Sequence, residues 1–250
     1  MLANQTIDKL EALGLSAMAA GLSEQLEAPG TYDELAFSDR LGLLVDRESD
    51  ARDSRRLATR LKAAKLRHPA TVEDIDFRSP RGLDRQVVLS LAEARFVVSH
   101  HNVVVTGATG CGKSFLACAL ANAALRHGHT ALYVRTPRLL DELSLGRSDG
   151  RYARLLGAMA RTSLLVLDDF LLTPAGVEAC RDLLEVVEDR TGLRSTIVVS
   201  QLPVDRWHGA MSDPTLAEAI LDRILASSHR IAMKGPSMRK RQPSEEVPSA

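Results

Sequence analysis

Eight consecutive residues constrain the fold of this chain more than any other segment. They match the pattern G-x-x-x-x-G-K-[ST] in full, and they follow a short apolar run, Val103–Thr106. A glycine-rich backbone can curl around an anion, with successive N–H groups turned toward it at the start of the following helix. The pattern therefore predicts a strand, a phosphate-binding loop and a helix in that order. The predicted loop residues are Gly107, Ala108, Thr109, Gly110, Cys111, Gly112, Lys113 and Ser114.

Within this loop, Lys113 is expected to reach the β- and γ-phosphates of a nucleoside triphosphate, and the Ser114 hydroxyl to complete a Mg²⁺ site. A second apolar run, Leu164–Leu167, ends in two carboxylates, Asp168 and Asp169. We expect Asp168 to hold Mg²⁺ together with Ser114, and Asp169 to polarise the water that attacks the γ-phosphate. The pair could instead simply end a strand before a turn, but the complete phosphate loop upstream favours the catalytic interpretation.

Short β-branched runs alternate with longer amphipathic stretches from residue 102 onward. This alternation predicts an α/β fold, with a parallel sheet flanked by helices and ligands at the carboxyl ends of its strands. The expected strands are Val103–Thr106, Ala131–Val134, Leu164–Leu167, Ser195–Ser200 and a weaker Arg230–Met233. Ser200 and Gln201 end one of these strands, where they could contact the γ-phosphate or merely begin a loop.

Residues 1–68 read as helical, with an N-cap expected at Thr6 and interruptions at Gly14 and Gly21. A second helical stretch is expected from about Ser38 to His68, before Pro69. Its apolar positions predict that it buries Leu41, Leu44 and Val45.

Composition excludes several classes of protein. Thirty-two basic and 32 acidic residues cancel, so only local charge can indicate a partner. Three cysteines without C-x-x-C spacing argue against a disulfide framework or a zinc site. The N-terminal segment has no basic and apolar leader, and no stretch approaches 18 apolar residues, so we expect a soluble, cytoplasmic protein without membrane contact.

Residues 51–68 carry seven basic side chains against one acid. If this segment is one helix, six of these side chains fall on one face, opposite Leu57, Leu61 and Ala64. Such a stripe can neutralise DNA phosphates without reading sequence, although a solvated helix face is the common alternative. The six residues are Arg52, Arg55, Arg56, Arg60, Lys62 and Arg67.

A second basic segment, residues 135–163, is longer than one crossover helix requires. It could carry an inserted helix that touches DNA, or an ordinary helical hairpin with outward-facing arginines. The DNA-contact candidates in this segment are Arg135, Arg138, Arg151 and Arg154.

Taken together, the chain resembles the IstB family, the ATP-binding helper proteins of certain insertion sequences, and more distantly the DnaC helicase loaders. Both belong to the AAA+ class of oligomeric ATPases. The resemblance covers nearly the whole chain and is carried by specific segments beyond the phosphate loop: 6–10, 40–44, 72–77, 81–85, 182–185, 200–208, 213–223 and 234–241.

The resemblance implies a helical N-terminal domain that binds DNA or a partner (1–68), an AAA+ ATPase domain (69–242) and a disordered tail (243–250). It implies ATP and Mg²⁺ as cofactors, and double-stranded DNA, a transposase and further copies of the chain as partners. Ser200 and Gln201 take the sensor I position, Arg223 that of an arginine finger and Arg239 that of sensor II, with Arg230 a weaker trans-acting candidate. The family commonly has glycine where this chain has Leu171, which could alter the backbone near Asp169.

These features predict a slow ATPase that assembles on DNA and recruits or activates a transposase. A DnaC-like helicase loader is the nearest alternative. A small-molecule kinase would need an acceptor pocket and a closing lid that the sequence does not reveal. A nucleotide-dead scaffold would not need the intact loop and the paired aspartates.

Overall fold

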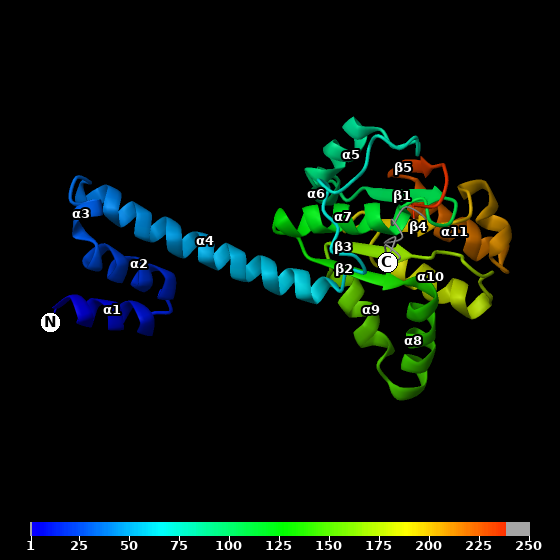
Figure 1. Ribbon diagram of the computed structural model, residues 1–250. Coiled ribbons are helices and arrows are strands. Elements are labelled where there is room, and N and C mark those ends of the chain that lie inside the picture. The colour runs from blue at the N-terminus through cyan, green and yellow to red at the C-terminus, as the bar shows by residue number, and fades with distance from the viewer. Residues whose placement is uncertain (1, 239–250) are drawn as a thin grey trace, which may run out of the picture. The chain divides into compact units, whose positions relative to one another are not determined.

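The computed structural model describes residues 2–238, which form two compact units (Figure 1). Met1–Thr59 is the helical unit and Arg60–Ala250 is the sheet unit. The division falls within a long helix, and the domain limits 1–68 and 69–242 stay predictions. Arg239 and the predicted tail, 243–250, lie outside the described residues.

The sheet unit contains five parallel strands in the order β2-β3-β4-β1-β5. All five predicted strands are confirmed, and four of them are longer than predicted by one or two residues. Their bounds are β1 Asn102–Gly107, β2 Ala131–Arg135, β3 Leu164–Asp168, β4 Ser195–Ser200 and β5 Ser228–Met233. Because β4 lies between β1 and β3, the phosphate loop and the two aspartates flank the carboxyl end of β4.

Helices cover both faces of the sheet, as the α/β pattern predicts. The predicted crossover at 135–163 is a hairpin of two helices, α8 and α9 (Figure 1). The helices of the sheet unit are α5 Arg85–Ala92, α6 Arg95–Val98, α7 Lys113–Arg126, α8 Thr136–Asp149, α9 Tyr152–Arg161, α10 Val177–Glu188 and α11 Pro214–Leu225, with 3₁₀ turns η1 Val204–Arg206 and η2 His208–Ala210. Among residues 2–238, no helix combines the length and apolar character needed to cross a bilayer.

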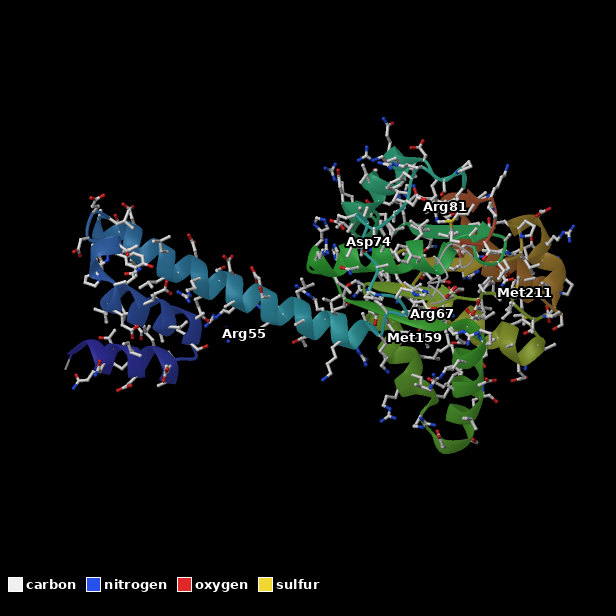
Figure 2. All side chains as sticks on the ribbon, viewed as in Figure 1. Arg55, Arg67, Asp74, Arg81, Met159 and Met211 are labelled. Carbon is white, nitrogen blue, oxygen red and sulfur yellow. The ribbon has the colours of Figure 1, made fainter. Side chains whose placement is uncertain are left out.

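Two clusters of buried side chains hold α8 to α11 against one face of the sheet. Met159 of α9 belongs to the cluster beneath the hairpin, and Met211 to the cluster around α10 and α11 (Figure 2). In the second cluster, Trp207 is fully buried, with its ring centroid 4.9 Å from that of Phe170. Its indole Nε1 donates a hydrogen bond to Leu202 O at 3.0 Å. Trp207 thereby ties the segment after β4 to the segment that follows the two aspartates.

Leu171, at the position where the resembled family commonly has glycine, adopts a left-handed backbone conformation. Its φ is 53°, and that of Asp169 is 56°. The Leu171 side chain is 4% exposed and packs in the cluster with Phe170 and Trp207. The chain therefore keeps the turn after Asp169 without glycine. The free energy gained by burying the Leu171 side chain offsets the cost of its strained backbone.

The helical unit contains α1 (Leu2–Ala12), α2 (Ser16–Glu27), α3 (Pro29–Tyr32) and the first part of α4 (Phe37–Ala64). The predicted N-cap at Thr6 is wrong, because α1 begins four residues earlier. Gly21 does not interrupt α2. A Cβ at Gly21 would lie 2.9 Å from Leu44 Cδ2, so this glycine permits close packing of α2 on α4.

The buried face of α4 differs from the predicted one. Leu44 is 7% exposed as predicted, but Leu41 and Val45 are 39% and 52% exposed. Glu48, one turn after Leu44, is 5% exposed. The buried face of α4 is therefore narrower than the predicted apolar face. It contains Leu44 and Glu48, and the Glu48 carboxylate binds α2.

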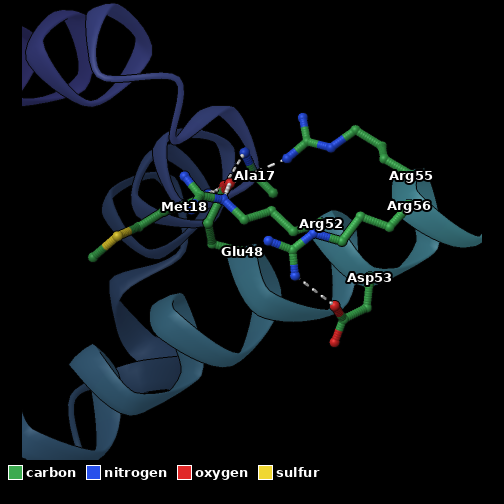
Figure 3. A network of polar contacts seen from close by, with 7 residues as sticks. All are labelled: Ala17, Met18, Glu48, Arg52, Asp53, Arg55 and Arg56. Carbon is green, nitrogen blue, oxygen red and sulfur yellow. Dashed lines mark hydrogen bonds and ion pairs between the residues drawn. The ribbon is translucent and has the colours of Figure 1, made fainter. Parts of the chain in front are cut away.

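Glu48 supplies the N-terminal cap that α2 lacks (Figure 3). The residue before α2, Leu15, has no side-chain acceptor, and Glu48 Oε2 accepts from the N–H groups of Ala17 and Met18 at 3.0 and 3.2 Å. Its other oxygen accepts from Arg52 Nε at 2.9 Å and Arg55 Nη2 at 3.1 Å. Burial alone would raise the pKa of Glu48, but the hydrogen bonds from Arg52 and these N–H groups lower it overall.

We expect Leu171→Gly to destabilise the sheet unit even though it relieves backbone strain. Left-handed backbone costs a non-glycine residue roughly 1–2 kcal/mol, whereas removing a buried leucine side chain costs roughly 2–5 kcal/mol. The net loss should be roughly 1–3 kcal/mol in urea unfolding followed by fluorescence of Trp207, the only tryptophan of the chain. Leu171→Ala, which keeps the strain, should lose more, and a Leu171→Gly variant as stable as the parent would contradict this account.

A second expectation concerns how the stabilising effect of Glu48 on α2 changes with pH. Because the pKa of Glu48 lies below its ordinary 4.5 in the folded chain, its stabilising effect is complete above pH 4.5 and is lost as the pH falls through the lowered folded value. Hydrogen-exchange protection of the Ala17 and Met18 amides should fall in that window. Glu48→Gln should reduce this protection at neutral pH and remove its acid dependence. Asp53→Asn, which breaks only the exposed ion pair with Arg56, is the control.

Candidate nucleotide-binding site

The phosphate loop joins β1 to α7, which begins at Lys113, in the predicted order of strand, loop and helix. Gly107, Gly110 and Gly112 have φ values of 147°, 85° and 99°. A Cβ at Gly107 would lie 2.2 Å from Met233 O, and one at Gly110 would lie 2.2 Å from Ser237 Oγ. The glycines therefore provide both the left-handed backbone and the room for neighbouring segments.

A cavity of about 350 Å³ lies beside this loop. It brings together the predicted residues from three strand ends: Thr109 to Ser114 of the loop (Cys111 apart), Asp168 and Asp169 after β3, and Ser200 and Gln201 after β4. Arg67, His68, Asp74, Asp76, Arg81 and Met238 also line it. The predicted convergence of loop, carboxylates and sensor residues is therefore present in the structure.

Lys113 is 7% exposed, and its Nζ donates a hydrogen bond to Ala108 O at 2.9 Å. The ammonium thus lies over its own loop, on the cavity side. Its position at the first turn of α7 adds to the positive end of the helix dipole, which favours an anion there.

Asp168 is 1% exposed and is held on both oxygens. Its Oδ1 accepts from the Asp169 N–H at 2.9 Å, and its Oδ2 accepts from the Tyr133 hydroxyl. Burial and the hydrogen bond to Asp168 raise the pKa of Tyr133, so the tyrosine stays a donor. Arg67 Nη1 lies 3.9 Å from the same Oδ2. Hydrogen bonds within the protein therefore fix the orientation of the predicted metal ligand.

Asp169 accepts a hydrogen bond from Arg135 Nε at 2.8 Å. Arg135, a predicted DNA-contact residue, is the last residue of β2 and is paired in register with Asp168. Its guanidinium thus neutralises the carboxylate that the sequence assigns to water activation.

The two residues after β4 lie in different environments. Gln201 Oε1 accepts a hydrogen bond from Thr109 Oγ1 at 2.6 Å, which links the end of β4 directly to the phosphate loop. The Ser200 hydroxyl donates to Phe170 O at 2.7 Å and accepts from the Leu202 N–H at 3.1 Å. Ser200 therefore fixes the turns around the site, and Gln201 is the better placed of the two to respond to the loop.

Sequence reasoning assigned no role to Tyr133 or Arg81. Tyr133 lies in an apolar strand and reads as a core residue, whereas Arg81 belongs to a segment that contributed only to the family resemblance. Arg81 is 6% exposed, and its Nη1 donates to Cys111 O at 3.2 Å. Its Nε is buried and has no hydrogen-bond partner among residues 2–238. Arg67, Asp74 and Arg81 are labelled in Figure 2.

The residues present fit a magnesium–nucleotide complex. The glycine cradle and the ammonium of Lys113 suit an anion. The Ser114 hydroxyl and the Asp168 carboxylate are the hard oxygen ligands that Mg²⁺ prefers.

The predicted basic stripe is shorter in the structure. The helix ends at Ala64 instead of His68, so Arg67 does not continue the stripe but lines the cavity. Arg52 and Arg55 pair with Glu48, and Arg56 Nη1 lies 3.3 Å from Asp53 Oδ1 (Figure 3). Arg60 Nη1 donates to Gly128 O at 3.1 Å, and Lys62 is exposed.

In the hairpin, Arg138 pairs with Glu142 at 3.3 Å and Arg151 with Asp149 at 2.6 Å, while Arg154 is exposed. Arg223, on α11, does not line the cavity of its own chain. Its Nε donates to Glu188, and its Nη1 donates to Ala219 O at 2.9 Å. Arg230 is exposed on β5.

Sequence relatives show the family to which the chain belongs. A family model described as IstB-like ATP binding protein matches residues 8–246. An insertion sequence ATP-binding protein of Sinorhizobium fredii (strain NBRC 101917 / NGR234) is 48% identical over 242 residues, which cover 97% of this chain and 98% of that protein. An ATP-binding protein of insertion sequence IS1162 from Pseudomonas fluorescens is 45% identical over 204 residues, covering 81% and 88%.

Solved structures share this fold. DnaI matches with a TM-score of 0.58 and 21% identity, covering 66% of this chain and 91% of that chain. The DnaC helicase loader matches with a TM-score of 0.55 and 20% identity, covering 68% and 100%. The fold, the cavity and the family match lead to one conclusion: the chain belongs to the family of IstB-like ATP-binding proteins.

Proposed function

We propose that this chain is an ATP-dependent DNA-binding helper of insertion-sequence transposition. It assembles with further copies of itself on double-stranded DNA and recruits or activates the transposase of its element. The observation that carries the proposal is the cavity at three strand ends, in a chain whose relatives are insertion sequence ATP-binding proteins.

In the nucleotide site, the N–H groups of the loop and Lys113 bind the phosphates. Ser114 and Asp168 would hold Mg²⁺, which would neutralise charge on the phosphates. Asp169 orients or deprotonates the attacking water, and the hydrogen bond from Arg135 Nε fixes the position of its carboxylate. Gln201 reports the state of the phosphates through its bond to Thr109.

Assembly supplies a further arginine to the cavity, from a neighbouring chain. Arg223 is 27% exposed and lies away from its own nucleotide site, as a residue that completes a neighbour's site must. An arginine of this kind stabilises the charge that develops on the transferred phosphoryl group. ATP binding and subunit contact therefore depend on each other.

DNA contact comes from basic side chains of α4 and of the hairpin, all of them exposed except the partly buried Arg60: Arg52, Arg55, Arg56, Arg60, Lys62, Arg138, Arg151 and Arg154. Exposed ion pairs such as Arg56–Asp53 and Arg138–Glu142 are worth roughly 0–1 kcal/mol, so a DNA phosphate can compete with the carboxylate. Affinity should fall steeply with salt, because binding of this kind releases counterions.

Lys113→Ala should weaken ATP binding by roughly 10- to 100-fold, since hydrogen bonds to charged groups are worth roughly 1.5–3 kcal/mol. ATP-dependent assembly on duplex DNA should disappear with it. Titration with a fluorescent ATP analogue and sedimentation with DNA measure the two effects. Lys9→Ala, at an exposed lysine of α1, is the control. A Lys113→Ala variant that assembles like the parent would overturn the proposal, as would a parent that does not retain its transposase on DNA.

Arg223→Ala should leave ATP affinity intact and reduce DNA-stimulated phosphate release by roughly 10³-fold or more. Mixing Arg223→Ala with Lys113→Ala should restore part of the activity, because an intact cavity of one variant then meets an intact arginine of the other. Glu188→Gln, which removes the partner of Arg223 but keeps the arginine, is the matched control. Failure of the mixture to recover any activity would argue against action between subunits.

A further inference from the structure

We propose that Arg67 is a phosphate-binding residue of the nucleotide site, supplied by the segment 65–70 that follows α4. The proposal rests on the proposed function, because it requires that the cavity binds a nucleotide. It replaces the DNA-contact role that the sequence pattern favours for Arg67.

Backbone geometry takes Arg67 off the helix. α4 ends at Ala64, and Lys65 has a φ of 52°, so the chain turns before Arg67. The arginine thereby leaves the predicted basic stripe and lines the cavity together with Lys113 and Asp168.

The segment is anchored on α7, the helix that begins with the loop lysine. The ring of His68 lies 6.2 Å from that of Phe115, the third residue of α7. Backbone hydrogen bonds join Arg67 and His68 to the buried thiol of Cys118, one turn further along α7. These contacts hold Arg67 in a constant relation to the phosphate loop.

Arg67 keeps hydrogen-bonding capacity for a ligand. Its Nη1 lies 3.9 Å from Asp168 Oδ2, which makes an ion pair beyond hydrogen-bond distance. Asp168 is already held by Tyr133 and by the Asp169 N–H. A guanidinium has five N–H donors in a planar fork that matches a phosphate, so its contacts with Tyr133 and Asp168 do not exhaust it. The side chain is 40% exposed, which gives it room to turn.

The position of Arg67 selects the terminal phosphate. Asp168 and Ser114 would hold the metal, which would act on the terminal phosphates of the nucleotide. An arginine beside Asp168 is therefore closer to the γ-phosphate than to the nucleoside. Arg67 should discriminate a triphosphate from a diphosphate, and the bound triphosphate should order residues 65–70.

The test compares Arg67→Gln with Arg181→Gln, which removes an exposed arginine of α10 that does not line the cavity. Equilibrium titration with magnesium and the non-hydrolysable analogue AMPPCP should show roughly tenfold weaker binding for Arg67→Gln, the loss expected for one charge-assisted hydrogen bond. Affinity for ADP should change by less than about threefold. Arg181→Gln should bind both nucleotides like the parent.

Hydrogen exchange provides a second readout that does not depend on hydrolysis. In the parent, AMPPCP should protect the amides of residues 65–70 more than ADP does, and Arg67→Gln should lose this difference. Equal AMPPCP affinity in Arg67→Gln and the parent would overturn the proposal. So would a loss confined to DNA affinity without nucleotide, which would restore the DNA-contact role. A parent that binds no nucleotide would instead overturn the proposed function.

Discussion

The close packing of other chain segments against the phosphate loop is the constraint on which the site depends. Met233, Ser237 and Arg81 approach Gly107, Gly110 and Gly112 so closely that no side chain fits at these positions. The conformation of the loop therefore depends on contacts with these neighbouring segments as well as on its own backbone preferences. Residues that precede β1 and residues that follow β5 meet at the loop, although more than 150 positions separate Arg81 from Ser237 in the sequence.

Around this loop, charge is balanced in pairs. Arg135 accompanies Asp169, and Arg67 accompanies Asp168, whose orientation Tyr133 also fixes. Buried carboxylates need such partners, because an isolated charge away from water is costly. The two arginines of these pairs remain partly exposed, and Arg67 lines the cavity, where it can face a polyanion. Catalytic geometry and stability thus use the same side chains here.

Sequence patterns were sufficient for the sheet and for the order of strand, loop and helix around Lys113. β-branched runs and a complete loop motif depend on short-range preferences that hold in any α/β fold. Features set by contacts between distant segments were missed. Leu41 and Val45 looked buried by their spacing, but α2 packs against α4 along a line through Leu44 and Glu48. Tyr133 and Arg81 gave no signal, since only the fold brings them to Asp168 and Cys111.

The hydrogen bond from the Met238 N–H to Gly110 O, at 2.9 Å, has a practical consequence for handling the protein. An affinity tag or fusion partner joined to the carboxyl terminus is attached to the compact unit that contains the phosphate loop, to which Met238 is hydrogen-bonded. Attachment at the amino terminus acts on a different compact unit, so recombinant material intended for measurements with adenine nucleotides is better labelled at that end.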